Sequence, residues 1–293
     1  MERFKYVRAS SVAEAVALLN DTQYRSRPLA GGTDLLLQLR HQPDVCDRVV
    51  DVAWIPELRR IERHADRVYI GAAVSFSKVM DSPLVNETAL VLAQACRLVG
   101  AVQIRNMGTL GGNVANAAAC ADSLPALVCL DAELAIVSPD GLVNIPVSEF
   151  ILAPNRTRLP KSGLIISISY PIPAPECRSV FLKLGRRNAM AISRLTVAAL
   201  GRLGVDGKIT EARYVPGSAT PGVSRLRAVE DHLLGKMPSA SLFQSAAQIA
   251  ADEVIRLAGK RWSSEFKEPA LMAMTARAFA LVFGLGENRE IVV

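Results

Sequence analysis

Two glycine-rich segments contain the residues whose types and spacing could do chemistry. The first is Gly31-Gly32-Thr33, and the second is Gly108-Thr109-Leu110-Gly111-Gly112-Asn113. Adjacent glycines allow positive φ angles and lack the Cβ atoms that would keep a ligand away from the main chain. Successive N–H groups in such a turn form a concave site for an anion. Two such loops, far apart in the sequence, could bind one diphosphate from both sides.

The residues alone do not identify the ligand of these loops. A hydrogen bond to a charged group contributes about 1.5–3 kcal/mol, so about four amides would hold the charged centre of a dinucleotide. A lone Gly-Gly pair, however, is usually a tight turn or a helix cap. Neither segment fits the G-x-G-x-x-G pattern or the P-loop pattern. The prediction at this level is therefore a pair of anion-binding loops.

Histidines and cysteines give no sign of a catalytic or metal site. The three histidines lie apart from any Ser/Asp or metal-ligand spacing, which favours solvated or capping roles. The five cysteines are widely spaced, and no C-x-x-C pair occurs, so we expect free thiols. No apolar run resembles a signal peptide or approaches a membrane span. We therefore expect a cytoplasmic protein without catalytic side chains or a bound metal.

Composition indicates a globular chain with more than one part. At 293 residues and 50% hydrophobic content, the chain is long enough for two or three subdomains. The net charge is +6, but the basic residues form small groups with acids between them. Aromatic residues for base stacking are scarce, so nucleic-acid binding is not expected.

The elements that must position the glycine segments follow from caps and periodicity. Ser11 and Glu14 form a capping-box pattern before a helix that should reach Leu19. A strand over residues 27–30 runs into the first glycine segment, and a helix follows over 35–40. A helix over 88–99, with Gly100 as a left-handed C-cap, precedes the second segment.

The pattern of predicted strands and helices changes near residue 164. A hairpin over 134–146 and a strand over 164–170 come before two prolines. Three strands follow over 180–187, 195–203 and 209–215, and then helices over 242–257 and 270–283. We expect an α+β fold with parts at 1–55, 56–175 and 176–293, the last with helices packed on one side of its sheet.

The motifs together resemble the FAD-binding subunits of molybdenum hydroxylases, and look most like bacterial xanthine dehydrogenase FAD subunits. The resemblance rests on the first glycine segment, on Gln103-Ile104-Arg105-Asn106 leading to the second, and on Ala121-Asp122-Ser123. The stretch 181–187 is similar to the start of the family's C-terminal domain. The resemblance implies a non-Rossmann FAD-binding fold of the PCMH type with two subdomains. A three-stranded antiparallel sheet with a helical bundle should follow.

The resemblance also implies roles for individual residues. Leu110 should lie near the flavin ring, and Asp122 should hydrogen-bond sugar or ribityl hydroxyls. Lys183 and Ile165 match positions near the isoalloxazine, and Val99 falls where some relatives have an aromatic residue. The implied cofactor-binding residues are Leu29, Ala30, Gly31, Gly32, Thr33, Asp34, Leu35, Leu36, Val99, Thr109, Leu110, Gly111, Gly112, Asn113, Asp122, Ile165 and Lys183.

In this family the cofactors are distributed among several subunits, so the resemblance implies partner subunits. A large subunit with molybdopterin would oxidise the substrate, and a small subunit would relay electrons through [2Fe–2S] clusters. FAD on this chain would pass them to NAD⁺ or another acceptor such as a quinone. Two alternatives stay open: a stand-alone FAD-linked oxidase or dehydrogenase, and a nucleotide-binding scaffold. This chain lacks the inserted iron–sulfur loop of some relatives, and it has Ala119-Cys120 where many have a proline.

Overall fold

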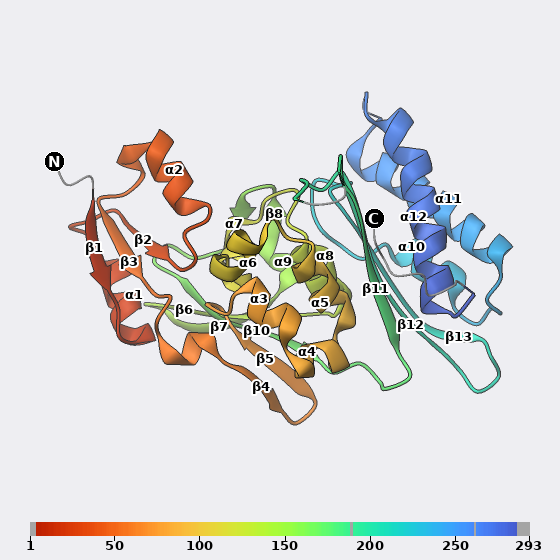
Figure 1. The fold of residues 1–293 in the computed structure, drawn as a ribbon, viewed down its shortest axis with the longest axis horizontal. Coiled ribbons are helices and arrows are strands. Elements are labelled where there is room, and N and C mark those ends of the chain that lie inside the picture. The colour runs from red at the N-terminus through yellow and green to blue at the C-terminus, as the bar shows by residue number, and fades with distance from the viewer. Residues whose placement is uncertain (1–3, 188–189, 261, 286–293) are drawn as a thin grey trace.

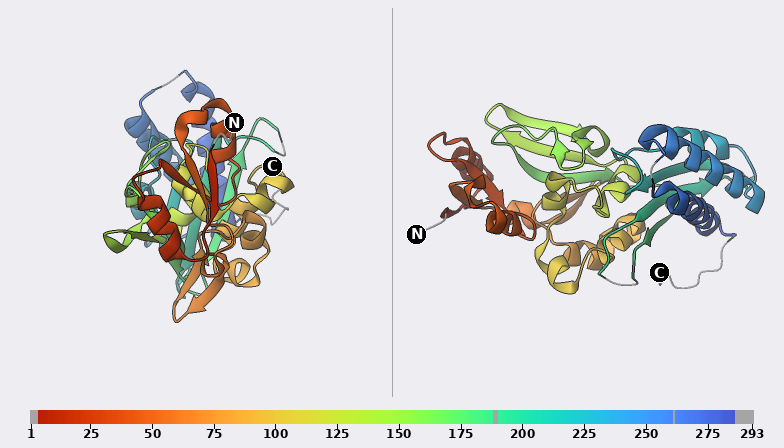
Figure 2. Two further views of the ribbon diagram at one scale, coloured as in Figure 1. Left: turned by 90° about the vertical axis from the view of Figure 1, so that its left-hand side faces the viewer. Right: turned by 90° about the horizontal axis from the view of Figure 1, so that it is seen from above.

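Three main sheets follow one another along the longest axis of the molecule (Figures 1 and 2). The computed structural model describes residues 4–187, 190–260 and 262–285. The N-terminal sheet lies at one end, the five-stranded sheet lies in the middle, and the third sheet with its helices lies at the other end.

The N-terminal sheet is parallel, and it carries the first glycine segment on the loop after its edge strand β2. The strand order is β1-β3-β2. Ser11 caps α1 by accepting from the Glu14 amide at 3.1 Å. The Glu14 carboxylate accepts from Ser10 and not from Ser11, so the expected capping box reaches one residue further back. The elements are β1 (Lys5–Arg8), α1 (Val12–Asn20), β2 (Ser26–Leu29), α2 (Leu35–His41), η1 (Pro43–Val45), β3 (Arg48–Asp51) and η2 (Pro56–Arg59).

The middle sheet is antiparallel with strand order β4-β5-β10-β6-β7. The expected hairpin is confirmed as β6 and β7. A small β8-β9 pair lies beyond it. The elements are β4 (Ile61–His64), β5 (Arg67–Gly71), β6 (Glu133–Ser138), β7 (Gly141–Pro146), α9 (Val147–Phe150), β8 (Ile151–Ala153), β9 (Arg156–Thr157) and β10 (Leu164–Pro171).

Six short helices between β5 and β6 differ most from the sequence expectation. The single helix expected over 88–99 is two helices, because Ala89 leaves the helical region at φ −150° and ψ 57°. The second glycine segment, expected as a loop, lies largely in the helix α7. The helices are α3 (Phe76–Asp81), α4 (Pro83–Thr88), α5 (Leu90–Arg97), α6 (Val102–Met107), α7 (Leu110–Asn116) and α8 (Ser123–Cys129).

The third sheet is antiparallel with order β11-β12-β13, and helices cover both of its faces (Figure 1). On β11, Val180 and Leu182 pack into the C-terminal core, whereas Phe181 packs into the middle core with α5 and α8. Side chains alternate between the faces of a strand, so both faces are apolar. The expectation of helices on one side was therefore incomplete. The elements are β11 (Arg178–Leu184), β12 (Leu195–Leu203), β13 (Ile209–Gly217), α10 (Arg227–Leu233), α11 (Ala240–Ala258) and α12 (Ser264–Val282).

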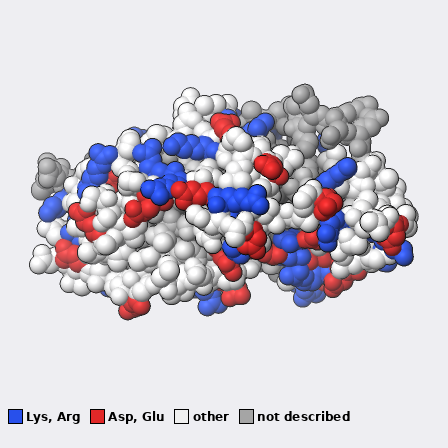
Figure 3. Space-filling model, turned by 90° about the horizontal axis from the view of Figure 1, so that it is seen from below, with Lys and Arg blue, Asp and Glu red and all other residues white. Residues whose placement is uncertain are grey.

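Charges of both signs are mixed over the surface. On the face drawn in Figure 3, Lys and Arg side chains alternate with Asp and Glu. Many of them form pairs, such as Arg25 with Asp47 at 2.7 Å and Arg67 with Glu133 at 2.8 Å. Within the described ranges, no helix combines the length and apolar character that crossing a bilayer requires.

Candidate functional site

The two glycine segments lie in direct contact, although they are far apart in the sequence. Gly31 follows β2 and packs on the main chain that joins α6 to α7. A Cβ atom on Gly31 would lie 2.0 Å from the Met107 carbonyl oxygen and 2.8 Å from the Gly108 Cα. Asn116 of α7 also donates to the Asp34 carboxylate at 3.0 Å. Only glycine permits this approach, so the first loop and the start of α7 form one continuous wall.

The loop after β2 presents main-chain amides that no other group in the described part of the chain uses. Gly32 has φ +71°, which turns the chain from β2 into α2. The N–H groups of Gly31, Gly32, Thr33 and Asp34 make no hydrogen bond within the residues that the structure describes. Asp34 precedes α2, but its side chain does not cap the helix. Residues 31–33 are half-buried and Asp34 is exposed, and consecutive donors of this kind have the arrangement of an anion site.

The rest of the first predicted segment surrounds these amides. Leu29 ends β2, and Ala30 follows it in the loop; both are half-buried. Leu35 and Leu36 begin α2, where Leu36 is 47% exposed. The expected residues of the first segment are therefore contiguous in space as well as in sequence.

The amides of residues 110–113 in the second segment already have partners, so the expectation of a free amide run there was wrong. The segment forms the first turn of α7, which packs on the end of β5, and Thr109 caps it with its hydroxyl. The Leu110 amide donates to Val74 O at 2.9 Å, and the Gly111 amide donates to Ala72 O at 3.0 Å. The Gly112 amide donates to Thr109 Oγ1 at 3.1 Å, and the Asn113 amide donates to Thr109 O at 3.0 Å.

Glycine is needed in α7 for packing as well. A Cβ on Gly111 would lie 2.5 Å from the Ala72 Cβ, so this glycine allows the helix to approach the sheet. Gly112 is exposed, and its missing Cβ would meet only the Thr109 hydroxyl, at 2.8 Å. Asn113 is half-buried and accepts from Ser123 at 2.7 Å. Gly112 and Asn113 are therefore the members of this segment that a ligand can reach.

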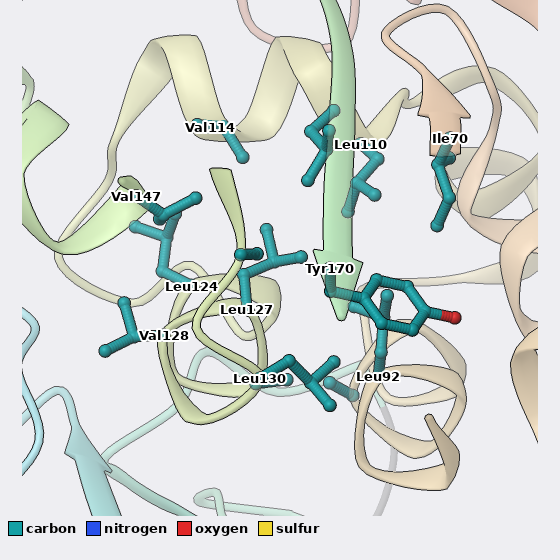
Figure 4. Close-up of a cluster of buried hydrophobic side chains, with 14 of the residues drawn as sticks. Ile70, Leu92, Leu110, Val114, Leu124, Leu127, Val128, Leu130, Val147 and Tyr170 are labelled. Carbon is teal, nitrogen blue, oxygen red and sulfur yellow. The ribbon is translucent and has the colours of Figure 1, made fainter. Parts of the chain in front are cut away.

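Leu110 and Ile165 belong to the hydrophobic core of the middle part. Leu110 has no exposed surface, and Figure 4 shows its side chain beside β10, close to Ile70. Ile165 lies on β10 and is 4% exposed. The main chain next to Ile165 bonds the end of β5, because Ile166 O accepts from Ala72 N at 3.0 Å. Both predicted residues thus lie behind the wall formed by α7 and support it.

Asp122 and Lys183 form a buried ion pair between the middle and third sheets. Lys183 Nζ lies 2.6 Å from Asp122 Oδ2, and the two side chains are 9% and 6% exposed. The Ser193 hydroxyl donates to the other oxygen of Asp122. Burial raises the pKa of the Asp122 carboxyl, and the Lys183 charge and the two hydrogen bonds oppose that rise. Both oxygens of Asp122 are therefore bonded within the protein.

Val99 lies in the turn between α5 and α6, one residue after the carbonyl that Lys183 contacts. Lys183 Nζ donates to Leu98 O at 2.8 Å. Val99 is half-buried and packs against the middle core. Lys183 therefore brings Asp122 and the Val99 turn together. Sequence reasoning missed Ser193 as a partner of Asp122, because the bond joins residues 71 positions apart.

A cleft of about 560 Å³ opens on the far side of Ser193. Cys120 and Ser193 form one wall, and α11 and α12 form the other, with Trp262 87% exposed at the rim. Arg194 and Lys267 add basic side chains. Because Ser193 bonds Asp122, this cleft adjoins the Asp122–Lys183 pair. The sequence did not predict it.

Comparison with known proteins covers most of the chain. Residues 2–173 match the FAD binding domain in molybdopterin dehydrogenase, and residues 180–282 match the CO dehydrogenase flavoprotein C-terminal domain. The chain is 30% identical over 277 residues to the xanthine dehydrogenase FAD-binding subunit of Escherichia coli O157:H7, with 94% of each chain covered. It is 27% identical over 279 residues to the glyceraldehyde dehydrogenase medium chain of Sulfolobus acidocaldarius, covering 94% of this chain and 97% of that one.

A solved structure gives the same result. The chain matches carbon monoxide dehydrogenase from Hydrogenophaga pseudoflava with a TM-score of 0.89 and 27% identity, over 96% of this chain and 98% of that chain. The likeness confirms the mixed helix and sheet fold expected from the sequence.

Proposed function

Since this chain belongs to the FAD-binding subunits of the molybdenum hydroxylases, a family of oxidoreductases, we propose that it transfers electrons within a multi-subunit complex. In this proposal it accepts electrons from [2Fe–2S] clusters on a small subunit. A large subunit with molybdopterin oxidises the organic substrate. NAD⁺ or another acceptor receives the electrons. Bound FAD would supply the chemistry, because a flavin can take up electrons singly and release them as a pair.

The contact between Gly31 and Met107 carries this proposal. It joins the first loop, with its unpartnered amides of residues 31–34, to the chain that enters α7, where Gly112 and Asn113 are accessible, and residues of this kind fit a diphosphate. The first loop, residues 29–36, would bind the phosphates with the amides of residues 31–34. Gly112 and Asn113 would bound the other side, and Thr109 would hold them through its cap on the first turn of α7. Leu110, Gly111 and Ile165 would hold that wall in place from behind.

The residues at the other end of the site would surround the flavin ring. The Lys183 ammonium is held by Asp122 and Leu98 O, so a buried positive charge lies beside the Val99 turn. A fixed positive charge near the ring would favour electron uptake, because it stabilises negative charge in a low-dielectric site. Val99 would offer an apolar surface to the ring. Asp122 would act through Lys183 and Ser193, since both of its oxygens are bonded to them.

The cleft behind Ser193 would receive the electron acceptor. It adjoins the Asp122–Lys183 pair, and its basic residues Arg194 and Lys267 suit an anionic molecule. Trp262 could stack on a planar base. These features support a dinucleotide such as NAD⁺.

We also propose that the protein functions in the cytoplasm, and its five free cysteines support this location. We place the domain limits at 1–55, 56–175 and 176–293, because each part has its own sheet.

The proposal is tested by purifying the chain alone and with its native partners. The isolated chain should be yellow and should release FAD on denaturation. The native complex should contain molybdenum, iron and two further subunits. A colourless chain that cannot be reconstituted with FAD would contradict the proposal. Turnover of a small organic substrate by the isolated chain would instead support a stand-alone oxidase or dehydrogenase.

A further inference from the structure

Two cationic side chains bind three consecutive carbonyl groups at the end of α5. Lys183 Nζ donates to Leu98 O at 2.8 Å. Arg105 Nη1 donates to both Val99 O and Gly100 O, at 3.0 Å each. Leu98 is the C-cap of α5, and Val99 and Gly100 follow it, so these carbonyls lie just beyond the helix and need partners from elsewhere. The turn is therefore held by Lys183 of the third sheet and by Arg105 of the middle part.

Arg105 reaches this turn from the helix that follows it. Gly100 has φ +44°, which reverses the chain between α5 and α6. The Arg105 side chain then folds back over the turn and is partly buried there. Its Nε is buried and has no hydrogen-bond partner among the described residues. An unpaired buried donor is unfavourable, so the two bonds from Nη1 must compensate for placing the guanidinium at this point.

The turn and the glycine segments lie at opposite ends of α6. This helix spans Val102–Met107, and its six residues measure roughly 9 Å at 1.5 Å per residue. At its far end, Met107 contacts Gly31, and the Arg105 side chain reaches back from the last turn of the helix to bond the Val99 turn at its near end. One short helix thus relates the proposed phosphate loop to the proposed ring pocket. The bonds from Arg105 fix the angle between that helix and the turn.

We propose that Arg105 is a positioning residue of the flavin site. It holds Val99 and Gly100 at a set place relative to α6, and so determines where this turn meets the flavin ring. Arg105 acts through the turn and does not need to touch the cofactor. This inference rests on the proposed function, because it assumes that FAD binds between the first loop and the Val99 turn.

The test compares Arg105→Ala, Arg105→Lys and a matched control in the full chain. Arg105→Ala should raise the Kd for FAD about tenfold, and it should shift the absorption maximum and midpoint potential of the bound flavin. Arg105→Lys should restore part of the affinity, since an ammonium can still donate to one carbonyl. The control is Arg97→Ala, which removes an exposed arginine from the last turn of α5. Within the described residues the Arg97 side chain makes no hydrogen bond or ion pair, so this variant should behave as wild type.

The outcomes separate this inference from the proposed function. If wild type binds FAD while Arg105→Ala keeps the same Kd, spectrum and potential, the positioning role is wrong and the proposed function stands. A purely structural role would lower the melting temperature and leave the spectrum of bound flavin unchanged, which also contradicts the inference. If Arg105→Ala does not fold, Arg105→Lys and Arg105→Gln carry the test, and wild-type flavin spectra in both would overturn it. Failure of wild type to bind FAD contradicts the proposed function itself.

Discussion

Asp122 and Lys183 face each other across the boundary between the middle and third sheets, 2.6 Å apart and both more than nine-tenths buried. Neither charge has free access to water, so each depends on the other. Removing one partner of such a pair leaves an uncompensated charge, whereas removing both is far less harmful. The pair therefore couples the orientation of the two parts to the proposed flavin pocket.

Lys183→Met should destabilise the protein in a pH-dependent way. At neutral pH we expect a loss of about 3–5 kcal/mol, because Asp122 stays buried without its partner. Burial already raises the pKa of Asp122, and loss of the Lys183 charge raises it further. A carboxyl whose pKa is raised in the folded state contributes its full stability when the pH is below its ordinary pKa of 3.8. This contribution is lost as the pH rises through the raised pKa. Urea unfolding between pH 5 and pH 8, values chosen for the assay, measures this trend.

The double variant Lys183→Met/Asp122→Asn is the control for this trend. It has no carboxyl at position 122, so its stability relative to wild type should depend less on pH. Equal pH profiles for the single and double variants would show that Asp122 is not the responsible group.

Gly31→Ala should separate the two glycine segments. The added methyl group would lie 2.0 Å from the Met107 carbonyl oxygen, so the first loop must move away from α6 and α7. We expect a loss of about 1–3 kcal/mol from overpacking and a large fall in FAD content per chain, measured from the flavin absorbance. Gly222→Ala is the matched control, because nothing lies within 4 Å of the new Cβ. Normal FAD content in Gly31→Ala would place the phosphate site elsewhere.

Asp131→Asn should weaken the second link between the middle and third sheets. Asp131 pairs with Arg225 at 2.8 Å and with Arg213 at 3.0 Å. Its side chain is 44% exposed, so solvent screens the pair, and we expect a loss of about 1 kcal/mol. Asn also tolerates the φ of +50° at this position. Thermal unfolding at low and high salt should show the difference shrinking as salt rises.

The control for Asp131→Asn is a variant that removes the same charge at a residue outside the ion pairs described. Asp140→Asn alters the turn between β6 and β7, where the structure gives Asp140 no salt bridge. It should leave the melting temperature nearly unchanged. A similar loss in both variants would point to net charge and not to the pairing of Asp131.

Thiol labelling should report on the proposed acceptor cleft. Cys46, Cys96 and Cys129 are buried and should resist alkylation until the protein unfolds. Cys120 and Cys177 are half-buried; burial raises the pKa of both, to about 11 for Cys177, so they should react slowly at pH 8. Cys120 lines the cleft, so NAD⁺ should slow its labelling and leave that of Cys177 unchanged. Equal rates with and without NAD⁺, read by mass spectrometry, would argue against this acceptor in the cleft.

The sequence by itself determined the elements whose signals are local. The cap at Ser11, the hairpin of β6 and β7 and the three strands of the last sheet follow from side-chain types within a few residues. The two glycine segments also stand out, because few other residues permit such close approach. These features identified the fold class and the family.

Only the tertiary structure decided how the segments meet and which groups remain available. The first amides of α7 are bonded to the segment after β5 and to Thr109, whereas those of residues 31–34 have no partner among the described residues, although the two glycine motifs look equally suitable in the sequence. The partners of Asp122, Ser193 and Arg105 likewise depend on chain approaches across long separations. A hydrogen bond between distant residues is set by packing of whole elements, and local composition does not encode it.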